Sequence, residues 1–153
     1  HLAALVSIDE TYIKNSGGAA GIIQGVILLD GAGYDIPILM ADAKSRLKEW
    51  YTQAFGNSKK EWEQASPVYW IKAGNKLPPF MIAYAGERYA SEIEAKMLSK
   101  KLTEAQIENK VFFYQKKTHL TISKELGEDN DKTTEDVLRF LLEKHYMAVN
   151  PTR

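Results

Sequence analysis

The sequence predicts an α/β protein with a mainly parallel sheet flanked by helices. Short apolar segments of strand length alternate with amphipathic helical segments, an order typical of parallel sheets. The first strand segment, residues 22–29, is apolar almost throughout rather than at every second position. That pattern is expected of a strand covered on both faces. With 153 residues, 44% of them hydrophobic and 26% charged, the chain is long enough for one globular domain with its own core.

Three segments have the length and the flanking turn residues of strands. Residues 22–29 end at an Asp-Gly pair, and residues 80–85 lie between two prolines and Gly86. The third segment is residues 111–114. Glycine and proline interrupt regular structure, so each of these apolar segments is bounded as a strand should be.

Helical segments separate the strands, recognised by apolar side chains that recur three or four positions apart. A Ser/Thr/Asp residue just before such a stripe indicates an N-cap, and a glutamate three residues further on completes a capping box. The expected helices are residues 1–6, residues 43–54 with Asp42 as N-cap, a short helix opened by Ser58 and Glu61 and ended by Pro67, residues 90–102, and a last helix capped at Thr133 with Val137, Leu138, Leu141 and Leu142 on its apolar face.

Composition excludes several classes of function. Lys+Arg 20 and Asp+Glu 20 give zero formal net charge, and no basic stripe stands out, so neither nucleic acid nor an anionic membrane surface is expected as the main partner. No apolar run approaches the ~20 residues of a membrane-spanning helix. With no cysteine, the chain offers no disulfide, thiol nucleophile or thiolate metal site.

The candidate site is the edge of the sheet where parallel strands end, because ligands of such sheets bind outside the carboxyl ends of the strands. His119 follows the third strand, and the loops 30–35 and 86–89 follow the other two. Imidazole titrates near neutrality, which suits a general base. An acid from one strand end could hydrogen-bond to the histidine and fix its tautomer. A solvated loop histidine beside unrelated surface acids gives the same spacing, so both interpretations stay open on spacing alone.

A resemblance favours the catalytic interpretation. Four segments, in order, resemble the C-terminal half of an esterase/lipase-type α/β-hydrolase, of the branch that includes small carboxylesterases and kynurenine-formamidase-like enzymes. They are residues 1–5, similar to the segment directly after the G-x-S-x-G serine elbow of that family; residues 25–31 with Tyr34 and Asp35; residues 65–68 with 77–82; and the histidine loop 118–122 with 126–128.

The resemblance implies the C-terminal portion of one α/β-hydrolase domain over residues 1–153, with a helical insertion at about 36–65. It implies hydrolysis of a carboxylic ester through an acyl-serine intermediate, with His119 as the general base, no metal and no organic cofactor. The serine would lie four residues before His1. Tyr89 stands where the family places its acid, so the nearest carboxylate, Glu87, is the candidate acid. Tyr34 and Leu120 are candidate substrate contacts.

Two alternatives remain. The altered acid position favours a degenerate, non-catalytic domain used for binding, or a fragment, whereas the intact histidine loop favours an enzyme. Within enzymes, an amidase or formamidase would use the same groups as an esterase. The expected partners are a small ester and the N-terminal half of the same hydrolase, covalently joined or as a separate chain. A homo-oligomer is the other expected association, because the first strand would otherwise keep an unpaired apolar edge.

Overall fold

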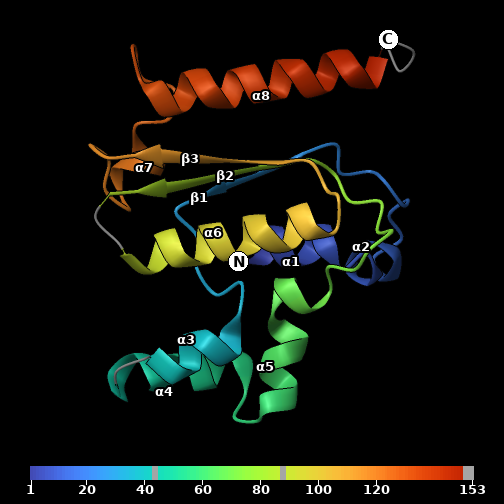
Figure 1. Ribbon diagram of the computed structural model, residues 1–153, viewed down its shortest axis with the longest axis vertical. Helices are drawn as coiled ribbons and strands as arrows, with labels where there is room; N and C mark the ends of the chain where they lie inside the picture. The colour runs from blue at the N-terminus through green and yellow to red at the C-terminus, as the bar shows by residue number, and fades with distance from the viewer. Residues whose placement is uncertain (43–44, 87–88, 150–153) are drawn as a thin grey trace.

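The computed structural model describes residues 1–42, 45–86 and 89–149. Its centre is a parallel sheet of three strands in the order β1-β2-β3, namely β1 (Val26–Leu29), β2 (Phe80–Ala85) and β3 (Asn109–Tyr114). Val26 lies beside Phe80, and Phe80 lies beside Asn109. The predicted α/β class with a parallel sheet flanked by helices is confirmed (Figure 1).

Helices cover both faces of this sheet (Figure 1). Helices α1 and α6 lie on one face, α8 lies on the other, and α3, α4 and α5 extend beyond α1 and α6, away from the sheet. The elements are α1 (Leu2–Ile8), α2 (Thr11–Asn15), α3 (Ile36–Asp42), α4 (Ser45–Phe55), α5 (Lys59–Ala65), the 3-10 turn η1 (Pro67–Tyr69), α6 (Tyr89–Glu104), α7 (Thr121–Lys124) and α8 (Lys132–Val149).

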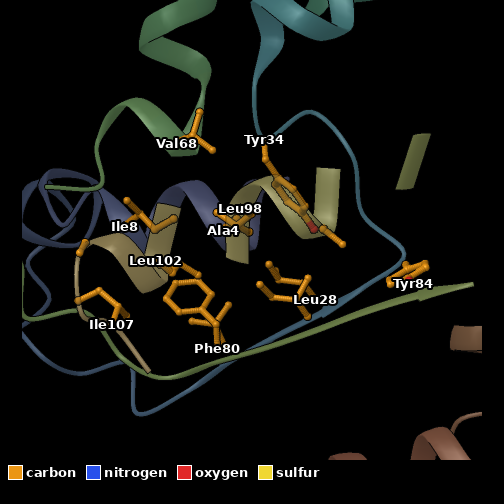
Figure 2. Close-up of a cluster of buried hydrophobic side chains, with 14 residues drawn as sticks. Ala4, Ile8, Leu28, Tyr34, Val68, Phe80, Tyr84, Leu98, Leu102 and Ile107 are labelled. Atoms are coloured by element: carbon orange, nitrogen blue, oxygen red, sulfur yellow. The ribbon is translucent and has the colours of Figure 1, made fainter. Parts of the chain in front are cut away.

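Every residue of β2 is buried, because strands flank it on both sides and helices cover both faces. Phe80 packs with Leu98 and Leu102 of α6 in the larger core cluster (Figure 2). On the opposite face, Met81 packs with Val137 and Phe140 of α8. The continuous apolar sequence of β2 is therefore explained by its central position.

The three predicted strands all form, with different precision at their ends. β2 has the predicted bounds, and β3 begins two residues earlier than predicted. β1 begins at Val26 rather than at residue 22. The hydrogen bond from Val26 N–H to Pro79 O, directly before β2, is where its pairing with β2 starts. Before that point β2 offers β1 no partner strand, and Ile22 is exposed despite its apolar side chain.

Two of the predicted helix starts are wrong and one is confirmed. Asp42 is the last residue of α3 rather than an N-cap. α8 begins at Lys132 rather than after a Thr133 cap, and the Asp131 carboxylate accepts the N–H of Thr134 at 2.8 Å. The capping box of α5 is present, with Ser58 as the N-cap. The prediction identified the polar cluster before α8 but assigned the cap to the wrong member.

Helix α8 is apolar on two sides. Val137 and Phe140 pack toward the sheet with Met81. Leu138, Leu141 and Leu142, which the sequence also placed on the packed face, are exposed. We call these three side chains the leucine face of α8. A helix that packs on one side only should keep its other side polar, so the leucine face is an unusual apolar surface on the outside of the described structure.

The outer edge of β1 is open in the part of the chain that the structure describes. Val26 and Asp30 N–H groups donate to Pro79 O and Ala83 O, on the β2 side. Successive backbone groups of a strand point to opposite sides, so Ile27 and Leu29 direct theirs outward. β1 is the terminal strand of the described sheet on that side. We call the backbone groups of Ile27 and Leu29 the open edge of β1.

Candidate active site

The carboxyl ends of all three strands meet at one buried carboxylate. Asp30 comes directly after β1, Ala85 ends β2, and His119 lies in the loop after β3. Asp30 Oδ1 accepts the N–H of Ala85 at 2.9 Å, and Asp30 Oδ2 lies 2.8 Å from His119 Nδ1. The Asp30 side chain is 0% exposed, whereas that of His119 is 57% exposed. A buried acid thus holds a half-exposed imidazole at the edge of the sheet.

This contact defines the tautomer of the neutral imidazole. An ionised carboxylate can only accept hydrogen bonds, so Nδ1 must be the donor to Asp30 Oδ2. The single proton of the neutral ring therefore sits on Nδ1, and Nε2 carries the lone pair. A ring fixed in this way can accept a proton at Nε2, and the carboxylate beside Nδ1 stabilises the imidazolium that forms.

The turn after β1 has an uncommon backbone that aims the Asp30 side chain. Asp30 has φ +49°, in the left-handed region that aspartate tolerates better than most residues. A Cβ on the next residue, Gly31, would lie 2.3 Å from the hydroxyl oxygen of Tyr34. Each residue of the Asp-Gly pair therefore has its own structural reason. Asp30 adopts a left-handed backbone conformation, and Gly31 leaves room for the Tyr34 side chain.

Helix α6 fixes the loop that comes after this turn. The buried Glu94 carboxylate accepts the N–H of Tyr34 at 2.7 Å. Burial raises the pKa of Glu94, and hydrogen bonds from the backbone of Tyr34, Asp35 and Gly33 oppose that rise. Burial also raises the pKa of Tyr34, and the negative charges of Glu94 and Asp30 raise it further, so the phenol stays protonated.

The histidine loop is anchored on both sides of His119. Lys117 contacts the carboxylates of Glu125 and Asp131, and these two hydrogen-bonded partners raise its pKa. Asp131 is itself the cap of α8. Immediately before His119, Thr118 N–H donates to Thr121 Oγ1 at 2.8 Å. The imidazole therefore projects from a loop tied to β3 at one end and to α8 at the other.

Substituting Gly31 by alanine should destabilise the fold by about 1–3 kcal/mol, the usual cost of forcing an extra methyl into a packed site. The added Cβ would meet the Tyr34 hydroxyl, so the cost should fall in a Tyr34→Phe background that lacks this oxygen. Urea unfolding of the four proteins of this cycle measures it. Equal costs of the Gly31 substitution in both backgrounds would contradict the close approach.

The predicted site residues lie in different surroundings. His119 is at the predicted edge and against a carboxylate. Leu120 is exposed beside it, whereas the Tyr34 side chain is buried in the core (Figure 2). Glu87 lies outside the described residues, and its contact with His119 stays a prediction, as do the substrate contacts of Tyr34 and Leu120. The sequence prediction did not select Asp30, although it directly follows a strand, as the candidate site required.

Within the described ranges, no group of three or more His, Cys, Asp or Glu side chains is arranged to hold a metal ion. Over those same ranges, no helix combines the length and the apolar character needed to cross a bilayer.

The chain is similar in structure to solved esterases. It superposes on esterase B from Lactobacillus rhamnosis, in a crystal with a C6-C4 SN3 inhibitor, with a TM-score of 0.70 at 17% identity, covering 99% of this chain and 51% of that one. A second crystal structure of esterase B gives 0.63 at 14% identity, covering 99% and 50%. A thermophilic esterase from Thermogutta terrifontis gives 0.53 at 15% identity, covering 82% and 42%.

No protein-family model and no curated protein sequence matches the chain. Identities this low show the fold alone. The chain has a parallel sheet flanked by helices that matches about half of an α/β-hydrolase fold, and it spans about half the length of the esterase structures it matches.

Proposed function

We propose that this chain is the histidine-bearing part of a carboxylic ester hydrolase that works through an acyl-serine intermediate. One observation carries the proposal. A half-exposed imidazole is bonded through Nδ1 to a buried carboxylate at the strand ends, in a fold that esterases share. On its sequence resemblance, we place the chain with the small carboxylesterases and kynurenine-formamidase-like enzymes. The serine belongs to a segment outside residues 1–153.

In the proposed reaction, His119 is the general base and then the general acid. Nε2 takes the hydroxyl proton of the serine as its oxygen attacks the ester carbonyl, and the imidazolium returns that proton to the departing alcohol oxygen. The acyl-serine forms as the ester C–O bond breaks. His119 then takes a proton from water as the water oxygen attacks the acyl carbon. The imidazolium returns that proton to the serine oxygen as the acyl–serine bond breaks, which releases the acid and restores the free serine. Leu120, exposed beside the imidazole, is the proposed apolar contact for substrate.

The proposed macromolecular partner is the N-terminal half of the same hydrolase, continuous with this chain or a separate one. Three features support it. The chain spans half of each esterase B structure, β1 ends the described sheet with an open edge, and the leucine face of α8 lies exposed. A strand added beside β1 would satisfy the backbone groups of Ile27 and Leu29. Self-association through the same edge is the competing outcome when that half is absent.

A pair of matched substrates tests the reaction class. In a protein that joins this chain to a serine-bearing N-terminal half, p-nitrophenyl acetate should be hydrolysed with an initial burst equal to the enzyme concentration, because the acyl-enzyme accumulates. The anilide p-nitroacetanilide has the same acyl group and should react far more slowly. A faster anilide would make the protein an amidase. No turnover of either substrate, together with no labelling by a serine-directed phosphonate, would contradict the proposal and favour a binding domain.

A further inference from the structure

We propose that Asp30, at the end of β1, is the carboxylate that positions His119 for catalysis, in place of an acid in the loop after β2. This inference rests on the proposed hydrolase function. Asp30 acts through the imidazole rather than on substrate, so it is a positioning residue of the reaction. The sequence resemblance placed this acid at or near Glu87, two residues after β2 ends.

The contacts of Asp30 use both carboxylate oxygens in a directed way. Oδ1 accepts the Ala85 N–H at 2.9 Å, and Oδ2 lies 2.8 Å from His119 Nδ1. The register pairs Leu29 with Ala83, so Asp30 is the first residue beyond the ladder and its side chain reaches the last backbone N–H of β2. The bond to Ala85 sets the plane of the carboxylate, and that plane presents Oδ2 to the imidazole.

Burial and backbone conformation both mark Asp30 as a functional group. Burying an ionised carboxylate is costly unless hydrogen bonds compensate it, and the Asp30 side chain is fully buried. A residue other than glycine at positive φ adds a further cost of order 1–3 kcal/mol, and such residues cluster at active sites. A residue needed only to close a turn would be less costly as glycine or asparagine. Neither of those residues supplies a negative charge beside His119.

This assignment also accounts for the sequence of the second loop. Tyr89, the first residue of α6 after that loop, stands where the resembled family places its acid, which by itself indicates a lost activity. β1 and β2 are adjacent strands that end at the same edge. An acid at the end of β1 therefore reaches the same imidazole as one after β2. With Asp30 in that role, a tyrosine at position 89 is compatible with an intact hydrolase.

The Asp30→Asn variant separates charge and tautomer from shape. The asparagine oxygen can keep accepting the Ala85 N–H, and its NH₂ group then faces His119 Nδ1. An NH₂ group can only donate, so Nδ1 must become the acceptor and the ring proton must sit on Nε2. Nε2 then has no lone pair with which to accept the proton of the serine. The matched control is Asp129→Asn, the same carboxylate-to-amide change at an exposed residue in the loop before α8. Glu87→Gln, in the loop after β2, tests the competing assignment.

In the complete hydrolase, we expect Asp30→Asn to lower kcat for p-nitrophenyl acetate by about 10⁴-fold, as amide substitution of a triad acid does. KM should change little. The Asp129→Asn control should stay within about threefold of wild type, like most surface substitutions, and Glu87→Gln should lower kcat far less than Asp30→Asn does. A large loss in Glu87→Gln with near-normal Asp30→Asn would overturn the assignment. Near-normal activity of both variants, with an inactive His119→Ala, would also overturn the assignment. That result would still support the hydrolase function.

A spectroscopic readout separates positioning from a structural role. An imidazole N–H bonded to a carboxylate gives a proton resonance well downfield of the amide region. In protein with ¹⁵N-labelled histidine, this signal should be assigned to His119 Nδ1, lost in Asp30→Asn and kept in Glu87→Gln. If Asp30→Asn does not fold, wild type and Glu87→Gln still decide the matter, because a signal lost in Glu87→Gln would overturn the proposal. Failure of the hydrolase function is recognised separately, because wild type would then neither turn over p-nitrophenyl acetate nor be labelled by a serine-directed phosphonate.

Discussion

Replacing His119 by alanine in the complete hydrolase should lower kcat/KM for short p-nitrophenyl esters by about 10⁴- to 10⁶-fold, because members of a catalytic triad act as a unit. Without the imidazole, the proposed base for the serine proton is gone, and the Asp30 carboxylate loses the group it holds at 2.8 Å. Steady-state hydrolysis, with active sites counted by the phosphonate, measures the loss.

The His119→Ala protein should remain folded, because the ring is more than half exposed and packs little surface. Lys116→Ala provides the matched control, since Lys116 is an exposed residue of the same loop and should leave kcat/KM within about threefold, like most surface substitutions. Thermal unfolding of both variants checks that the fold is kept. Hydrolysis that survives His119→Ala nearly unaltered would remove His119 from the mechanism and, with it, the proposed function.

Residues 1–153 expressed alone should show no esterase activity and should aggregate or self-associate. Both effects would have the same origin, because in the described residues no strand lies on the outer side of β1 and the proposed serine belongs to the segment that would add one. The open edge presents unpaired backbone groups on an apolar strand, which is a template for association, and the leucine face of α8 adds apolar surface. Adding the N-terminal half, as a fusion or as a second chain, should restore a defined size in size-exclusion chromatography together with activity.

Two proline substitutions in β1 test whether the open edge drives association. Ile27→Pro removes an N–H that points outward, and edge strands tolerate proline at such positions. It should therefore reduce self-association while keeping the β1–β2 ladder. Leu28→Pro removes an N–H on the β2 side and should unfold the sheet. A monomeric, fully active protein made of residues 1–153 alone would contradict both the need for a missing half and the serine mechanism.

The sequence predicts the elements whose signals are local. β2 is apolar over its whole length and bounded by prolines and glycine, so both of its ends were correct. The predicted start of β1 was wrong, because Ile22 is as apolar as the strand itself. Only the lack of a neighbouring strand beside Ile22 excludes it from β1. The prediction of which α8 side chains face the sheet was wrong for a related reason. Val137 and Leu138 are both apolar, and periodicity cannot tell which of them meets the sheet.

Of the two site residues, the one with a local signal was predicted and the other was not. His119 was predictable because a single rule, that functional groups come after parallel strands, points to it. Asp30 also follows a parallel strand, but the family resemblance predicts the acid in the loop after β2. Its contact with His119 depends on a positive φ and on the Ala85 N–H. Neither can be read from residue types, because both arise only when the neighbouring strands are in register.

The pair formed by Asp30 and His119 joins positions 89 residues apart in the chain. Contacts of such long range form only after much of the intervening chain has been ordered, and they are lost in any partial opening that separates its ends. If the segment from β3 to α8 detached while β1 and β2 stayed paired, most of the backbone would remain folded but the imidazole would leave its acid. On mild heating or in low denaturant, activity should therefore disappear before the bulk of the helical signal.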